Sequence, residues 1–219
     1  MSGKFPSRPP QAWSRLCETA AGGGAADVDL PLGELCRVLA ASRPGGVFLC
    51  LGSGAGGIGA WVLDGMDLSS RLVIVVGGDE EADLLRPILG DDLRVTVHVQ
   101  DPAGFLGDVR EHRFDLIADL CPGPPADATG LALGALAPGG FCVTHHDIAE
   151  LAKMLSTETP GFEGIPGVDS LVSTGLPLEP GVSLVVRGPP RARARRRGGR
   201  RTRQGVTPLF SSRPRRGDR

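Results

Sequence analysis

The sequence contains no tyrosine, and phenylalanine and tryptophan together make up only 4% of its 219 residues. A catalytic Tyr-x-x-x-Lys motif is therefore impossible. No apolar run reaches the roughly 20 residues that a membrane-spanning helix needs. The first ten residues, MSGKFPSRPP, lack the apolar core of a secretory signal peptide. We therefore expect a cytoplasmic protein that does not enter a membrane.

Cysteine is present, but nowhere in a paired spacing. The five cysteines are scattered along the chain and include no Cys-x-x-Cys pair. An odd, scattered set favours neither a disulfide framework nor a structural zinc cluster. We expect reduced thiols, several of them buried. They are Cys17, Cys36, Cys50, Cys121 and Cys142.

Charge is divided unevenly along the chain. The formal net charge is −1, from 24 basic and 25 acidic side chains. Twelve of the arginines lie beyond residue 187, where Asp218 is the single acidic residue, so the preceding body is acidic. The sequence predicts a partly disordered N-terminal segment (1–27), one α/β domain (28–187) and a disordered Arg-rich tail (188–219). We favour a non-functional extension, or an association of the tail with the acidic body, over weak, salt-dependent binding of RNA or another polyanion by this tail. We expect no other contact with nucleic acid.

The stretch that organises the domain is VFLCLGSGAGGIGAWVL, residues 47–63. It begins with an apolar run typical of a strand buried on both faces. A cluster of five glycines follows, and apolar residues then resume at helical spacing. Glycine permits the backbone angles of a tight turn and lets a ligand approach the main chain, while free N–H groups at the helix start favour an anionic group. The stretch therefore predicts the strand, turn and helix of a nucleotide-type binding fold.

Strand and helix patterns alternate through the rest of the domain. Predicted strands are 71–76, 93–99, 114–118, 141–144, 168–174 and 182–186, and predicted helices are 13–20, 30–41, 80–89, 105–111, 127–136 and 148–155. This alternation predicts a doubly wound, mostly parallel sheet covered on both faces. Ligands of such sheets bind at the carboxyl ends of the strands. The polar residues at those ends are the glycine loop, Asp79, Asp101, Asp119 and His145–Asp147, and we expect them at one edge.

Two classes of ligand use this layout, and one is a nicotinamide dinucleotide. Gly52-x-Gly54-x-x-Gly57 and Gly54-x-Gly56-x-x-Gly59 both satisfy the GxGxxG pattern, although a glycine cluster matches almost any spacing. The short-chain dehydrogenases, which need a Tyr-x-x-x-Lys motif, are excluded because the chain has no tyrosine. An NAD(P)-dependent oxidoreductase of another type stays an alternative.

An ordered series of motifs resembles the class I S-adenosylmethionine (SAM)-dependent methyltransferases. Residues 49–56 (LCLGSGAG) are similar to the family's first motif, a hydrophobic strand followed by GxGxG. Residues 75–79 (VVGGD) and 99–101 (VQD) resemble the second and third motifs. From about residue 31 to 187 the chain resembles the catechol and caffeoyl-CoA type O-methyltransferases, because LVSTGLPLEPGV (171–182) is similar to their final hairpin.

The resemblance implies a Rossmann-like, seven-stranded sheet whose last strand is antiparallel, and methyl transfer from SAM to a hydroxyl oxygen of a small-molecule acceptor. It implies that Asp79 takes the ribose hydroxyls and that Asp101 meets the adenine amino group. The implied cofactor-binding residues are Gly52, Ser53, Gly54, Gly56, Asp79, Asp101 and Asp119.

The catalytic end departs from the family's pattern. The family holds a divalent metal with an Asp after the fourth strand and an Asp-Asn pair after the fifth, where this chain has Asp119 and His145-His146. These three are the candidate catalytic residues and the candidate ligands of Mg²⁺ or Mn²⁺. Either a metal or a base can remove the proton of the acceptor hydroxyl. A catalytically silent fold that binds SAM or a partner protein stays open, as does a homodimer.

Overall fold

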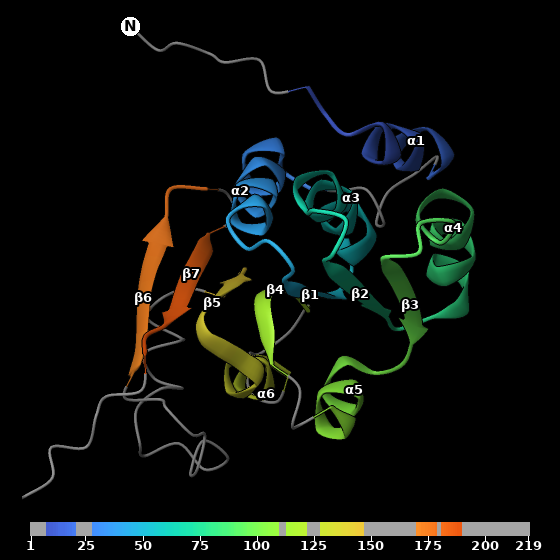
Figure 1. Cartoon of the computed structure of the whole chain (residues 1–219). Coiled ribbons are helices and arrows are strands. Elements are labelled where there is room, and N and C mark those ends of the chain that lie inside the picture. Colours follow the sequence, from blue (N-terminus) through green and yellow to red (C-terminus); the bar gives the residue numbers. More distant parts are fainter. Residues whose placement is uncertain are drawn as a thin grey trace, which may run out of the picture.

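The structure, a computed structural model, describes residues 8–20, 28–109, 113–121, 128–146, 170–178 and 181–189. A single seven-stranded sheet has helices on both faces (Figure 1). The strands are β1 (Val47–Gly52), β2 (Arg71–Val76), β3 (Val95–Val99), β4 (Phe114–Leu120), β5 (Leu136–Thr144), β6 (Leu171–Leu176) and β7 (Val182–Arg187). The helices are α1 (Gln11–Thr19), α2 (Leu30–Ala41), α3 (Ala55–Gly65), α4 (Asp79–Leu89), α5 (Pro102–Asp108) and α6 (Ala128–Ala135). None of these helices has the length and apolar character needed to cross a membrane.

The strand order is β3-β2-β1-β4-β5-β7-β6. Strands β1 to β5 pair in parallel, and β7 is antiparallel to both of its neighbours, β5 and β6. The predicted doubly wound sheet with an antiparallel last strand is therefore confirmed. From β1 the chain moves outward to β2 and β3, then returns to place β4 on the other side of β1. The carboxyl ends of β1 and β4 thus form the switch point at which such sheets bind ligands.

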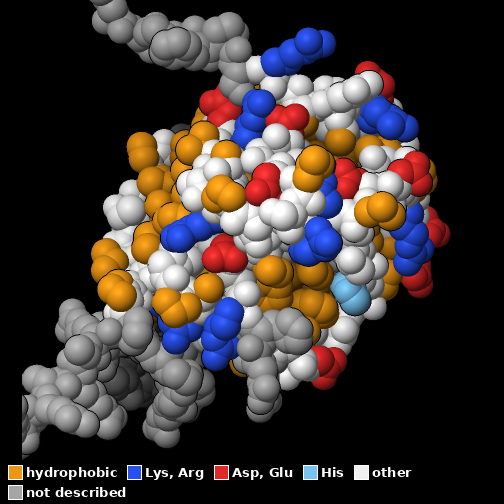
Figure 2. Space-filling view, in the orientation of Figure 1, with side chains coloured by type: hydrophobic (Ala, Val, Ile, Leu, Met, Phe, Trp, Pro, Cys, Tyr) orange, Lys and Arg blue, Asp and Glu red, His pale blue; other side chains and the backbone are white. Residues whose placement is uncertain are grey.

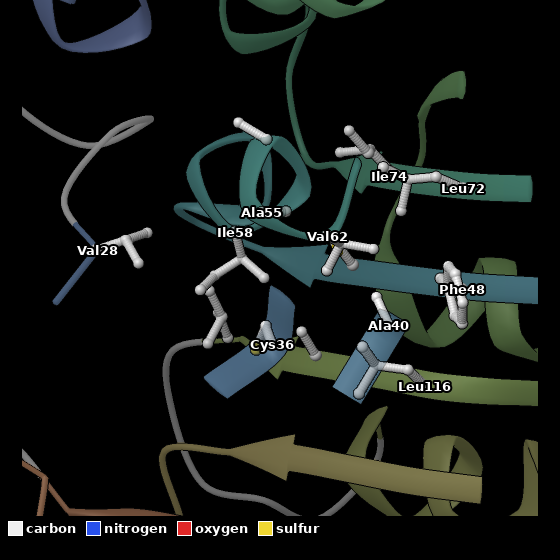
Figure 3. Close-up of a cluster of buried hydrophobic side chains, with 14 of the residues drawn as sticks. Val28, Cys36, Ala40, Phe48, Ala55, Ile58, Val62, Leu72, Ile74 and Leu116 are labelled. Atoms are coloured by element: carbon white, nitrogen blue, oxygen red, sulfur yellow. The ribbon is translucent and has the colours of Figure 1, made fainter. Parts of the chain in front are cut away.

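Two apolar clusters cover the two faces of the sheet. Helices α1 to α4 pack on one face and α5 and α6 on the other. Strand β1 supplies both clusters because its side chains alternate: Phe48 and Cys50 join the first, Leu49 and Leu51 the second. Figure 3 shows part of the first cluster, in which Phe48 shares its face with residues of α2 and α3. A strand buried on both faces holds the glycine turn that follows it in place.

Several boundaries differ from the predicted ones. Helix α5 spans Pro102–Asp108 rather than 105–111, since the Asp101 side chain caps it by accepting the Gly104 N–H at 2.9 Å. Strand β5 starts at Leu136 rather than 141, because a register shift opposite β4 and a left-handed Gly139 (φ 79°) carry the strand through its Pro-Gly-Gly segment. The predicted helix 148–155 and the tail beyond residue 189 lie outside the described residues.

Candidate functional site at the carboxyl edge of the sheet

The glycine turn between β1 and α3 lies at the switch point. Gly52 and Gly54 have φ angles of 87° and 81°, a left-handed conformation that side chains disfavour, and Gly54 is the N-cap of α3. A Cβ atom on Gly52 would lie 2.6 Å from the Cys121 nitrogen, so the backbones that follow β1 and β4 are in contact there. Ser53 is exposed. The predicted strand, turn and helix are therefore confirmed, and Ser53 is the exposed residue of a turn whose glycines are buried.

Gly56 has a packing role. A Cβ atom at this position would lie 2.1 Å from Leu85 Cδ2, so α3 can approach α4 closely only because residue 56 has no side chain. This contact brings the first turns of the two helices together. It also means that the structure explains Gly56 without a ligand.

Asp79 and Asp101 follow β2 and β3, as predicted. Asp79 is the first residue of α4 and is exposed, and Asp101 is the exposed N-cap of α5. Carboxylates are favoured at both positions by the helix N-terminus alone. Between β2 and α4, Gly77 and Gly78 border open space, since a Cβ atom on either would have no neighbour within 4 Å.

Glu81 is a candidate that the sequence did not reveal. Its Oε1 atom is buried and has no hydrogen-bond partner among the described residues. Burial raises the pKa of this carboxyl group, and the N–H of Gly54 acts in the opposite direction. A carboxylate from α4 therefore faces the glycine turn. The signal was present as the acidic run Asp79-Glu80-Glu81 directly after Gly77-Gly78, but a run of acids at a helix start is also an ordinary helix N-terminus.

Asp119 is fully buried at the end of β4. Its Oδ2 accepts the Thr129 hydroxyl of α6 at 2.5 Å, and its Oδ1 accepts the Cys121 N–H at 3.2 Å. In the sheet register Asp119 is paired with Leu51, a member of the cluster under α5 and α6, so its side chain lies on that face. Asp119 thus anchors α6 to the end of β4.

The two histidines after β5 differ in their surroundings. His145 is half-buried; burial lowers its pKa, while the charge of Asp119 raises it and that of His146 lowers it further. His146 is 8% exposed, and its carbonyl oxygen accepts the Ser183 hydroxyl of β7 at 2.6 Å. The structure therefore brings His145 under the influence of Asp119 and ties His146 to β7. Asp147 lies outside the described residues.

A metal site does not emerge from these residues. Within the described ranges, no three His, Cys, Asp or Glu side chains lie close enough together to hold an ion. Both oxygens of Asp119 already accept hydrogen bonds from the protein. The predicted ligands Asp119, His145 and His146, as they are placed, do not fit a divalent metal.

We compared the sequence and the fold with those of known proteins. No protein-family model and no curated protein matches the sequence. Among solved structures, the O-methyltransferase TomG from Streptomyces achromogenes in complex with SAM superposes with a TM-score of 0.65 at 18% identity, over 84% of this chain and 92% of that one. The O-methyltransferase from Bacillus cereus in complex with SAH gives a TM-score of 0.62 at 18% identity, over 84% and 93%. A methyltransferase from Geobacter sulfurreducens gives 0.63 at 19%, over 84% and 91%.

This chain has the Rossmann-like methyltransferase fold. At such identities the fold is what is shared. In the methyltransferase fold of this chain, the glycine turn, Asp79, Glu81 and Asp101 all lie on the carboxyl side of β1, β2 and β3. The open space beside Gly77 and Gly78 and the unsatisfied carboxylate oxygen of Glu81 fit a ligand that carries hydroxyl donors.

Proposed function

We propose that the protein transfers a methyl group from SAM to a hydroxyl oxygen of a small-molecule acceptor. The observation that carries the proposal is the left-handed glycine turn at the switch point of a sheet with the methyltransferase fold. Solved structures of this fold include O-methyltransferases in complex with SAM and with SAH.

Cofactor binding falls to the carboxyl ends of the first three strands. The turn Gly52–Gly56 offers its main chain, and one carboxylate of α4 and Asp101 offer acceptors to the hydroxyl and amino groups of the nucleoside. When bound, SAM supplies an activated methyl group on a sulfonium. The protein's task is then to hold donor and acceptor oxygen in line, which supplies a large part of the rate enhancement in such transfers.

Proton removal falls to His145. A pKa lowered below the ordinary 6.5 keeps its imidazole neutral at neutral pH, and a neutral imidazole can accept the proton of the acceptor hydroxyl. Asp119 is then a positioning residue, whose charge favours the imidazolium that forms. Since no metal site is found among the described residues, we assign the step to a protein base.

A pH profile tests this role. We expect the methylation rate to fall on acidification, with an inflection below pH 6.5, because protonated His145 cannot accept a proton. His145→Gln should lower kcat by about 10²- to 10⁴-fold and remove that inflection. His146→Gln is the matched control and should keep the inflection. If His145→Gln had the same pH profile as wild type, another group would accept the proton of the acceptor hydroxyl.

The proposal as a whole is tested by calorimetric titration with S-adenosylhomocysteine, with and without Mg²⁺ or Mn²⁺. We expect binding that does not depend on the metal, followed by turnover on a panel of phenols and catechols. Binding without turnover on any acceptor would favour a catalytically silent fold. Absence of heat, with NADH binding instead, would overturn the proposal in favour of an oxidoreductase.

A further inference from the structure

We propose that Glu81, rather than Asp79, is the carboxylate that binds the ribose hydroxyls of the cofactor. This inference rests on the proposed function, since it assigns a residue of the same site. Sequence spacing points to Asp79, because it is the first acidic residue after β2. The three-dimensional placement of α4 points to Glu81.

Helix periodicity separates the two carboxylates. Residues four apart lie on the same face of a helix, so Glu81 shares a face with Leu85 and Asp79 shares one with Asp83. Leu85 is buried against Gly56 of α3, whereas Asp83 is exposed. Glu81 therefore lies one turn before the contact between α3 and α4, beside the start of α3. Asp79 lies on the side of α4 that faces solvent.

One carboxylate oxygen of Glu81 lacks a hydrogen-bond partner among the described residues. The Gly54 N–H interacts with the carboxylate, while Oε1 is buried without a partner among the described residues. A buried acceptor without a donor is unfavourable, and proteins satisfy such groups with few exceptions. A vicinal diol brings two O–H donors, and a carboxylate offers two acceptor oxygens. A ribose placed on the glycine turn would supply the missing donor.

The connection between β2 and α4 leaves open space beside Glu81's helix. Gly77 and Gly78, which connect β2 to α4, border open space and carry no side chain that would separate the turn from α4. Nothing in these two residues can itself accept a hydroxyl hydrogen through a side chain. Leu85 fills the apolar contact of α4 with Gly56, and Glu81 is the acidic side chain of α4 that interacts with the turn, through the Gly54 N–H.

The test is calorimetric titration of the full chain with S-adenosylhomocysteine and with its 2′-deoxy analogue. The variants are Glu81→Gln, Asp79→Asn and, as the matched control, Glu80→Gln, which neutralises an exposed carboxylate of the same helical turn. Thermal unfolding checks that each variant is folded. We expect wild type to prefer the 2′-hydroxyl ligand by about 10- to 100-fold, the range of a hydrogen bond to a charged group.

Glu81→Gln should bind S-adenosylhomocysteine about 10-fold or more weakly and lose most of that preference, since a neutral amide is the weaker acceptor. Asp79→Asn and Glu80→Gln should bind like wild type. Unchanged binding by Glu81→Gln, or loss of the preference in Asp79→Asn instead, would overturn the inference while leaving the proposed function standing. Failure of wild type to bind S-adenosylhomocysteine would remove the proposed function, and the inference with it.

Discussion

At the scale of single residues, two glycines with nearly the same φ angle allow two costs of replacing glycine to be measured separately. One cost comes from the left-handed backbone, and the other comes from steric contact of the added side chain. Gly52 and Gly181 have φ angles of 87° and 89°. A Cβ atom on Gly52 would meet the backbone of Leu120 and Cys121 at 2.6 Å, whereas one on Gly181 would meet nothing within 4 Å. Gly181→Ala should cost about 1–2 kcal/mol for the left-handed backbone alone. Gly52→Ala should cost about 1–3 kcal/mol more for the added contact.

Urea denaturation of the two variants measures this difference. Gly52→Ala should also weaken S-adenosylhomocysteine binding, because the turn must shift, and Gly181→Ala should not. Equal losses of stability in the two variants would mean that β1 and β4 can move apart without cost. The close approach at the switch point would then have no energetic weight.

The burial of Glu81 predicts that this side chain lowers the stability of the free protein at neutral pH while it favours ligand binding. Its pKa in the folded protein is raised above the ordinary 4.5 by burial, so between these two pKa values the folded chain binds more protons than the unfolded one. Stability therefore falls as the pH rises through that window. Glu81→Gln, which carries no charge, should be more stable than wild type at pH 7 and equal to it near pH 4. Glu80→Gln, the exposed control, should show no such pH-dependent difference.

Urea unfolding between pH 4 and 8 checks this expectation. A Glu81→Gln variant that is less stable than wild type at pH 7, by more than Glu80→Gln, would contradict it. Such a result would make the Gly54 interaction the main role of the side chain. A residue that destabilises the free protein is expected where a ligand supplies the compensation.

Asp119 shows where prediction from sequence reaches its limit. The sequence places it correctly at the end of β4, but it does not tell which face of the sheet the side chain occupies. In a strand that alternates, the apolar positions would identify the core face, yet FDLIADL is buried on both faces and carries no period of two. The register with Leu51 decides it, and only the fold supplies that register. The sequence did not identify Glu81 as a candidate for a related reason, since its proposed role depends on which helix α4 contacts.

At the scale of elements, the strands and helices could be predicted from the sequence, because buried strands and glycine or proline turns leave strong local signals. The ends of these elements were harder to predict where a contact with a residue distant in sequence extends an element. Strand β5 continues through Pro138-Gly139-Gly140 because β4 pairs with it across a register shift. Local sequence alone marks that segment as a turn.

Helix α1 gives a prediction at this scale. Its one buried residue, Leu16, has no exposed surface and belongs to the cluster that α2, α3 and α4 share. The Trp13 ring packs in a tilted arrangement against the Trp61 ring of α3, with the ring centroids 6.0 Å apart, and this contact helps the short helix to dock. Leu16→Ala should cost about 2–5 kcal/mol and remove the exchange protection of the α1 amides.

Hydrogen exchange with mass spectrometry reads out both the helix and the domain. Glu18→Ala, on the exposed side of α1, is the control and should change stability by less than about 0.5 kcal/mol. Should Leu16→Ala be as mild as Glu18→Ala, α1 would be an accessory to the core rather than a part of it. Loss of protection confined to α1 would place its docking below the stability of the sheet.

At the scale of the whole molecule, charge separates the folded body from the Arg-rich tail. Acidic and basic side chains are interspersed on the face of the described body in Figure 2. Up to residue 189 the chain holds 12 basic and 24 acidic side chains, and the remaining residues hold 12 arginines and one acid. The last described strand, β7, ends at Arg187. The tail therefore adds charge without adding a described element to the sheet.

This division predicts that polyanion binding and cofactor binding separate cleanly. Any binding of single-stranded RNA by the full chain should be weak and limited to low salt. Its affinity should fall by about tenfold or more between 50 and 200 mM salt, because arginines that neutralise phosphates release counterions. A chain that ends at Pro189 should lose this binding and keep its affinity for S-adenosylhomocysteine, since its net charge is strongly negative. Filter binding and calorimetry measure the two. If the shortened chain also lost affinity for S-adenosylhomocysteine, the tail would contribute to the cofactor site. If it kept RNA binding, the acidic body would have to bind RNA despite its negative net charge.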